Sequence, residues 1–236
     1  MIIYFKALTP DGVSFNYPAI PWATRPGEVT KAPYRVSASS LGDLVVSNTA
    51  TGCVGMEWPA RLLVVTLPPR ETAFELNDVE AEAYAWVTVE ERPGHELLGP
   101  QGAYVADLIG RLDKLTAPQA RPIAATFRRL QPAVIGWTRD DERTLAAVHR
   151  PGDARYPAFN AARRAAVAAV GRAADRSRGQ KGWAGTTEAV ELAVLGLMMR
   201  DRVGENTYRL LTNPLAAALG RLHPGDHHPL PTLVKA

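Results

Sequence analysis

The spacing of apolar residues along the chain changes near residue 100. Before that point, apolar side chains alternate with polar ones or form short continuous runs, which is typical of β-strands. In the last such stretch, Ala83, Ala85, Val87 and Val89 alternate with more polar residues and are expected to share one buried face. The strands that this pattern predicts cover residues 3–8, 13–17, 34–37, 61–67 and 83–89.

Two segments of the same region are expected to lie outside the sheet. Residues 18–33 contain four prolines and predict a surface loop. Ser39 or Ser40 provides a hydroxyl that caps a helix, so a short helix is expected from there to Val46.

After residue 101 the apolar period changes to that of amphipathic helices. The helix over 187–202 is apolar on nearly every side, so it is expected to be buried at the centre of its unit. Pro122 is expected to interrupt the second helix. The helices that the pattern predicts cover residues 104–115, 118–130, 138 onward, 157–175, 187–202, 205–211 and 214–222.

The predicted fold class is therefore α+β. A small antiparallel or mixed sheet forms a unit over 1–98, and an all-α unit follows over 99–222. Residues 223–236 contain three prolines and are expected to form an extended tail.

Charge is strongly sorted along the chain. Residues 1–110 carry 7 Lys or Arg and 13 Asp or Glu, whereas residues 111–181 carry 15 and 6. The positive middle segment faces either a polyanion or the acidic N-terminal unit, and the sequence leaves both possibilities open. If it binds nucleic acid, the expected contacts are Arg163, Arg164, Arg172, Arg176, Arg178 and Lys181.

Other candidate chemistry is sparse. The single cysteine, Cys53, excludes an internal disulfide framework and a multi-cysteine zinc site, and it is expected to be a small buried apolar residue. His223, His227 and His228 are candidate metal ligands by proximity, but prolines between and after them break any helix, so no metal site is predicted. No phosphate-binding loop or nucleophile elbow is present, and no cofactor is expected.

The chain contains no apolar run long enough to cross a bilayer and no secretory signal pattern. A cytoplasmic protein without a membrane partner is therefore expected. Formation of a homo-oligomer is left open.

Two blocks resemble a family of uncharacterised proteins from actinobacterial phages and their hosts. The first is the opening segment 4–12, followed by 34–45; the second lies within 193–224 and includes Met199-Arg200-Asp201 and Gly220-Arg221-Leu222-His223-Pro224. The resemblance implies a β-rich N-terminal unit and a helical C-terminal unit. It implies no catalytic residues.

The N-terminal block also resembles ADP-ribosyltransferase-like folds, in which an Arg, a Ser and a late Glu hold NAD. Arg35, Ser37 and either Glu90 or Glu91 are the residues that this resemblance assigns to those roles. Three functions are thus expected in order: a non-enzymatic, phage-related interaction protein with a macromolecular partner, a nucleic-acid-binding protein, and an NAD-dependent transferase.

Overall fold

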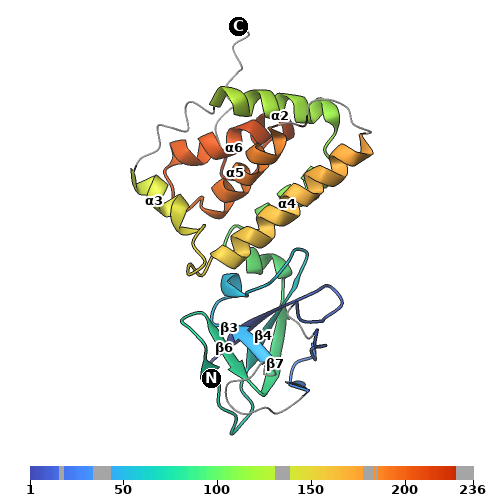
Figure 1. Ribbon diagram of the computed structural model, residues 1–236, viewed down its shortest axis with the longest axis vertical. Helices are drawn as coiled ribbons and strands as arrows, with labels where there is room; N and C mark the ends of the chain where they lie inside the picture. Colours follow the sequence, from blue (N-terminus) through green and yellow to red (C-terminus); the bar gives the residue numbers. More distant parts are fainter. Residues whose placement is uncertain (16–18, 34–43, 131–138, 178–182, 184, 227–236) are drawn as a thin grey trace. The chain divides into compact units, whose positions relative to one another are not determined.

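The computed structural model describes residues 1–15, 19–33, 44–130, 139–177, 183 and 185–226. The chain divides into two compact units (Figure 1). The sheet unit comprises Met1–Gly102 together with Pro151–Ala161, and the helical unit comprises Ala103–Arg150 and Ala162–Ala236. Segment Pro151–Ala161 therefore belongs to the sheet unit, although the sequence pattern assigned it to the helical one.

Within the described residues, a seven-stranded antiparallel sheet forms the sheet unit and six α-helices follow it along the chain, so the α+β class is confirmed. The strand order is β2-β7-β4-β1-β3-β6-β5. The strands are β1 (Tyr4–Leu8), β2 (Val29–Lys31), β3 (Leu44–Ser47), β4 (Arg61–Thr66), β5 (Phe74–Glu75), β6 (Glu80–Ala83) and β7 (Ala85–Arg92), and short 3-10 segments lie at Ala50–Gly52 and Gly94–Leu98.

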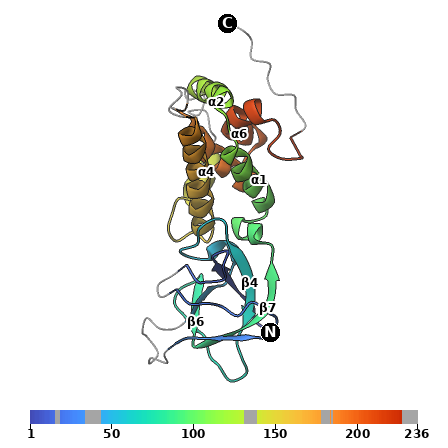
Figure 2. The same ribbon diagram turned by 90° about the vertical axis from the view of Figure 1, so that its right-hand side faces the viewer.

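The sheet is curled, because only Tyr84 separates β6 from β7 although three other strands lie between them in the strand order. Figure 2 shows β6 and β7 on different sides of the unit, with β7 beside β4. The buried face also changes across this bend. Ala83 and Ala85 are buried as predicted, but Trp86 and Thr88 are buried after the bend in place of Val87 and Val89, which are half-buried. The single alternating strand predicted at 83–89 is therefore wrong.

Trp86 occupies the centre of the sheet unit. It is fully buried, its indole Nε1 donates a hydrogen bond of 2.8 Å to the Leu44 carbonyl, and Tyr4 packs edge-on against its ring at 4.9 Å between centroids. Leu44 and Val46 belong to the same core and pair with β6. The helix predicted up to Val46 is therefore wrong from residue 44 on, because pairing with β1 and β6 outweighs a local capping signal.

The loop predicted over 18–33 contains the edge strand β2, which pairs with β7. Two threonines fix the preceding turn: the Thr30 hydroxyl accepts from the Ala23 amide at 2.9 Å, and the Thr88 hydroxyl donates to the Ala23 carbonyl at 2.6 Å. Trp22 is buried beside them. A proline-rich segment can pair at a sheet edge because only one side of the strand needs amide donors.

Most helices begin and end close to their predicted positions. The exceptions concern proline: α2 continues through Pro122, and the two short helices predicted after residue 204 are one helix that contains Pro214. Pro122 lies on the exposed side of α2, away from the packed side of the helix. The helices are α1 (Gly102–Asp113), α2 (Ala117–Leu130), α3 (Arg139–Ala147), α4 (Tyr156–Arg176), α5 (Thr186–Met198) and α6 (Glu205–Leu219).

Helix α5 is the buried centre of the helical unit, as its sequence predicts. It lies beside α6 and α2 (Figure 1). The α5–α6 contact is close because Gly196 has no side chain: a Cβ atom there would lie 2.9 Å from Leu211 Cβ. Asp141 of α3 holds the start of α6, since its carboxylate accepts from the Gly204 amide at 3.1 Å and from the Thr207 hydroxyl at 2.6 Å.

Two glycine substitutions test this packing. Gly196→Ala should lower the free energy of unfolding by about 1–3 kcal/mol, because the added methyl group pushes α5 from α6. Gly171→Ala in α4 is the matched control: a Cβ there meets no atom within 4 Å, so it should raise stability by about 0.5–1 kcal/mol. Urea unfolding followed by circular dichroism measures both. Equal stabilisation by the two substitutions would contradict the close α5–α6 contact.

Candidate functional site

Three of the arginines predicted to bind nucleic acid are paired inside the helical unit. Arg163 of α4 donates to Glu191 of α5 at 3.1 Å. Arg172 Nε donates to Asp113 Oδ1 at 2.8 Å, and Arg176 lies 3.8 Å from the same carboxylate and also bonds the Asp113 carbonyl. The hydrogen bond from Arg172 is the main cause that lowers the pKa of Asp113. These side chains therefore connect α4 to α1 and α5.

The other predicted contacts are less informative. Arg164 also has an interaction within the structure. Arg178 and Lys181 lie outside the described residues. Asp113 lies 59 and 63 residues from Arg172 and Arg176, so the local sequence pattern does not reveal these two pairs.

Helix α2 carries a different group of basic residues. Its inner side buries Ala120, Ile123, Ala124 and Phe127, whereas its outer side exposes Pro118, Arg121, Pro122, Arg128 and Arg129. We call these last five residues the α2 outer face. The helix begins at a fixed turn, because Gln119 Oε1 accepts from both the amide and the hydroxyl of Thr116.

The sequence segment around α2 contains no carboxylate of its own. The sequence between Lys114 and Arg139 contains no Asp or Glu. Among the described residues, no carboxylate lies within ion-pair distance of Arg128 or Arg129, and Arg128 Nε only reaches back to the Ala124 carbonyl at 3.3 Å. Net charge does not distinguish α2 from α4, since both helices carry +3, but α2 has basic residues and no Asp or Glu, and that feature can be read from the sequence.

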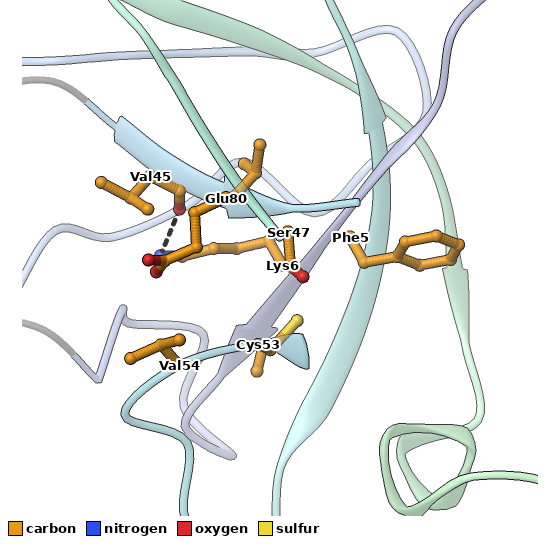
Figure 3. Close-up of a pocket in the computed structure, with 9 residues that line it drawn as sticks. Phe5, Lys6, Val45, Ser47, Cys53, Val54 and Glu80 are labelled. Carbon is orange, nitrogen blue, oxygen red and sulfur yellow. Dashed lines mark hydrogen bonds between the residues drawn. The ribbon is translucent and has the colours of Figure 1, made fainter. Parts of the chain in front are cut away.

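A second site lies in the sheet unit, where β1 turns a lysine inward. Lys6 is 8% exposed and alternates with the buried residues Tyr4 and Leu8. Its ammonium donates to the Val45 carbonyl at 2.8 Å (Figure 3) and lies 5.2 Å from the centroid of the Trp22 ring. Burial lowers the pKa of Lys6 to about 8, against smaller opposing effects of Cys53 and Glu80.

Lys6 borders a small pocket whose other polar side chains are Ser47, Cys53 and Glu80 (Figure 3). Cys53 is buried, as predicted, and burial raises the pKa of its thiol to about 12. The thiol therefore stays protonated at neutral pH and is a poor nucleophile or metal ligand. The sequence pattern missed Lys6 because Ile3, Phe5 and Ala7 make the opposite side of β1 the more apolar one, whereas the structure buries the side of Tyr4, Lys6 and Leu8.

The residues assigned by the ADP-ribosyltransferase resemblance do not form a described cleft. Arg35 and Ser37 lie outside the described residues. Glu90 and Glu91 are exposed on β7, and Glu91 accepts a two-pronged hydrogen bond from Arg61 at 2.7 and 2.6 Å. This bond lowers the pKa of Glu91. Its carboxylate thus has a structural partner on β4.

His223 belongs to a polar cluster at the end of the helical unit. The Asp226 carboxylate accepts from the Tyr208 hydroxyl and from the His223 amide, both at 3.0 Å, and lies 3.4 Å from Arg200. The His223 ring packs edge-on against Tyr104, and burial lowers its pKa. These contacts fix the turn after α6 to the helices.

His227 and His228 lie outside the described residues, so the structure does not test them as metal ligands. Within the part of the chain that the structure describes, no three His, Cys, Asp or Glu side chains are grouped to hold a metal ion. No described helix combines the length and apolar composition needed to span a bilayer.

Comparisons with protein-family models, curated proteins and solved structures give no match to this chain.

Lys6→Met tests the buried charge. The unfolded lysine, with a pKa near 10.5, binds its proton more tightly than the folded one, with a pKa of about 8. Between these pH values the unfolded state therefore holds more protons, and stability should rise with pH. Relative to Lys6→Met, the wild-type protein should gain up to about 3 kcal/mol of unfolding free energy from pH 7.5 to 10.5.

Urea unfolding of both proteins at pH 7.5, 9 and 10.5 measures this difference. Lys31→Met, at an exposed position of β2, is the matched control for loss of a lysine. A stability difference between wild type and Lys6→Met that stays constant with pH would show that the Lys6 ammonium is not desolvated.

Proposed function

We propose that this is a non-enzymatic protein that binds a macromolecular partner, and that the partner is nucleic acid held through its phosphate backbone by the α2 outer face. The main support for this proposal is that the charged residues on the exposed side of α2 are all basic. Arg128 and Arg129 point away from the buried side of the helix, in a segment without carboxylates.

Arginine suits this role because its planar guanidinium pairs with phosphate oxygens through two hydrogen bonds. Arg121 and Arg128 are seven residues apart, which places them on the same side of the helix about 10 Å apart along its axis. Contacts of this kind set affinity and orientation but do not read base sequence. Binding should therefore depend weakly on sequence and strongly on salt.

The arginines of α4 are the natural comparison. Arg172 and Arg176 have the same charge but share Asp113, so part of their positive charge is already neutralised within the helical unit. We therefore expect α2, in place of α4, to make the main contact with nucleic acid.

The double variant Arg128→Ala/Arg129→Ala tests this expectation. Fluorescence anisotropy of a labelled 20-base-pair duplex is measured between about 50 and 200 mM salt, where such binding is most salt-dependent. The slope of log affinity against log salt should fall in magnitude by roughly 2 units, because each lost phosphate contact removes about 0.9.

Arg172→Ala/Arg176→Ala changes the net charge equally and should leave the slope near that of the wild type. The reverse result, with a reduced slope only in the α4 variant, would assign binding to α4. Failure of the wild-type protein to retain any DNA or RNA at about 50 mM salt, where phosphate contacts are strong, would end the proposal.

A further inference from the structure

Strand β5 (Phe74–Glu75) forms one edge of the sheet, and among the described strands it pairs only with β6. The Leu76 amide donates to the Glu80 carbonyl at 2.9 Å, so residue 76 directs its main-chain groups toward β6. Because these groups alternate sides along a strand, the amide and the carbonyl of Glu75 point away from β6. A further strand on that side could pair with both of them.

The same edge exposes two large apolar side chains. Phe74 and Leu76 are 47% and 48% exposed, and Phe74 is the only aromatic residue among the exposed large apolar residues of the described chain. The two are separated by one residue, so they lie on the same face of the sheet. Ala73, on the alternate face, packs against the core of the sheet unit. Phe74 and Leu76 are therefore on the outer face, where the side chains of an added strand could cover them.

The hairpin that carries this edge is acidic. Segment 71–82 contains five Asp or Glu and no Lys or Arg. In the described part of the chain, no basic side chain lies within ion-pair distance of Glu75 or Asp78. The negative charge at the edge is therefore available to a partner, and it favours a basic segment over an acidic one or a nucleic acid.

These charges also oppose pairing with a second copy of the chain. Two β5 strands that paired about Glu75 would bring two Glu75 carboxylates opposite each other, and like charges at opposite positions are destabilising. A basic residue at the position opposite Glu75 turns this repulsion into attraction. The edge thus discriminates by charge between a basic partner and a copy of itself.

We propose that β5 binds an extended, basic segment of another protein, which joins the sheet as an eighth strand. The residue opposite Glu75 exchanges both main-chain hydrogen bonds with it, and the two side chains lie on the same face. A Lys or Arg at that position therefore meets the Glu75 carboxylate. Its two neighbours along the segment lie beside Phe74 and Leu76, so the segment recognised alternates apolar and basic residues.

Main-chain pairing and side-chain contacts have different roles in this binding mode. The hydrogen bonds at Glu75 contribute to affinity for any extended segment, whereas the alternating side chains select the segment. The proposal is independent of nucleic-acid binding by α2, because a basic peptide carries the charge that the α2 outer face repels. Failure of one proposal therefore leaves the other intact.

The experiment titrates the wild-type protein into a fluorescein-labelled peptide of alternating valine and lysine and follows fluorescence anisotropy. Methylation of the lysine amides removes the donor to the Glu75 carbonyl and should weaken binding by about tenfold or more. Methylation of the valine amides, which point away from β5 in this pairing, should leave binding within about twofold. Equal effects of the two methylations, or no anisotropy change at about 0.2 mM protein, would overturn the proposal.

Glu75→Lys tests the charge at the edge. It places like charges opposite each other and should weaken binding of the valine–lysine peptide by about tenfold or more. Glu28→Lys, at an exposed position just before the other edge strand β2, changes the net charge equally and should leave binding near that of the wild type. Loss of binding only in Glu28→Lys would assign the peptide to β2. Equal weakening by the two variants would show attraction without a site, and either result would overturn the proposal.

A second copy of the chain is the competing occupant of this edge. Phe74→Ser removes the exposed ring and should weaken peptide binding by about fivefold or more without changing the sedimentation coefficient. Circular dichroism checks that this variant keeps its fold. A wild-type dimer that dissociates in Phe74→Ser would assign the edge to self-association and would overturn the proposal.

Discussion

Ion pairs between α4 arginines and carboxylates on neighbouring helices connect the helical unit and neutralise part of its positive charge. Asp113 at the end of α1 accepts from Arg172 and lies near Arg176, and Glu191 of α5 accepts from Arg163. Each such half-exposed pair adds only about 0–1 kcal/mol to stability. Its larger consequence is electrostatic: Arg163, Arg172 and Arg176 lie beside carboxylates of neighbouring helices, whereas Arg128 and Arg129 of α2 have no ion pair among the described residues.

Stability itself rests on apolar burial in each unit. Helix α5 is covered on most sides and approaches α6 through Gly196, and the curled sheet closes around Trp86. Lys6 is the exception within that second core. Burial of its ammonium group is unfavourable, and this is the main cause that lowers the pKa of Lys6.

The periodicity of the sequence predicted the α+β class, the burial of α5 and the positions of most helices, because those features depend on which side of an element is apolar. The periodicity failed where contacts between segments distant in sequence determine the secondary structure. Leu44 and Val46 are in a strand because β1 and β6 lie beside them. The shift of the buried face at Trp86 depends on a bend that no local pattern reports.

The candidate sites were harder to predict for the same reason. Arg172 is paired with Asp113, which is distant in sequence. The net charge over 111–181 therefore overstates the positive charge of α4 that is available to a partner. The prolines of α2 and α6 likewise predicted breaks that packing and solvent exposure make unnecessary. The buried position of Lys6 became visible only when the register of β1 against β4 was known.

Hydrogen–deuterium exchange with and without a DNA duplex locates the nucleic acid on the unmodified protein. If α2 holds the DNA, amide exchange should slow on DNA addition over Ala117–Leu130, with little change over the α4 residues 162–176. Protection confined to α4 or to the sheet unit, with none in α2, would contradict this proposal.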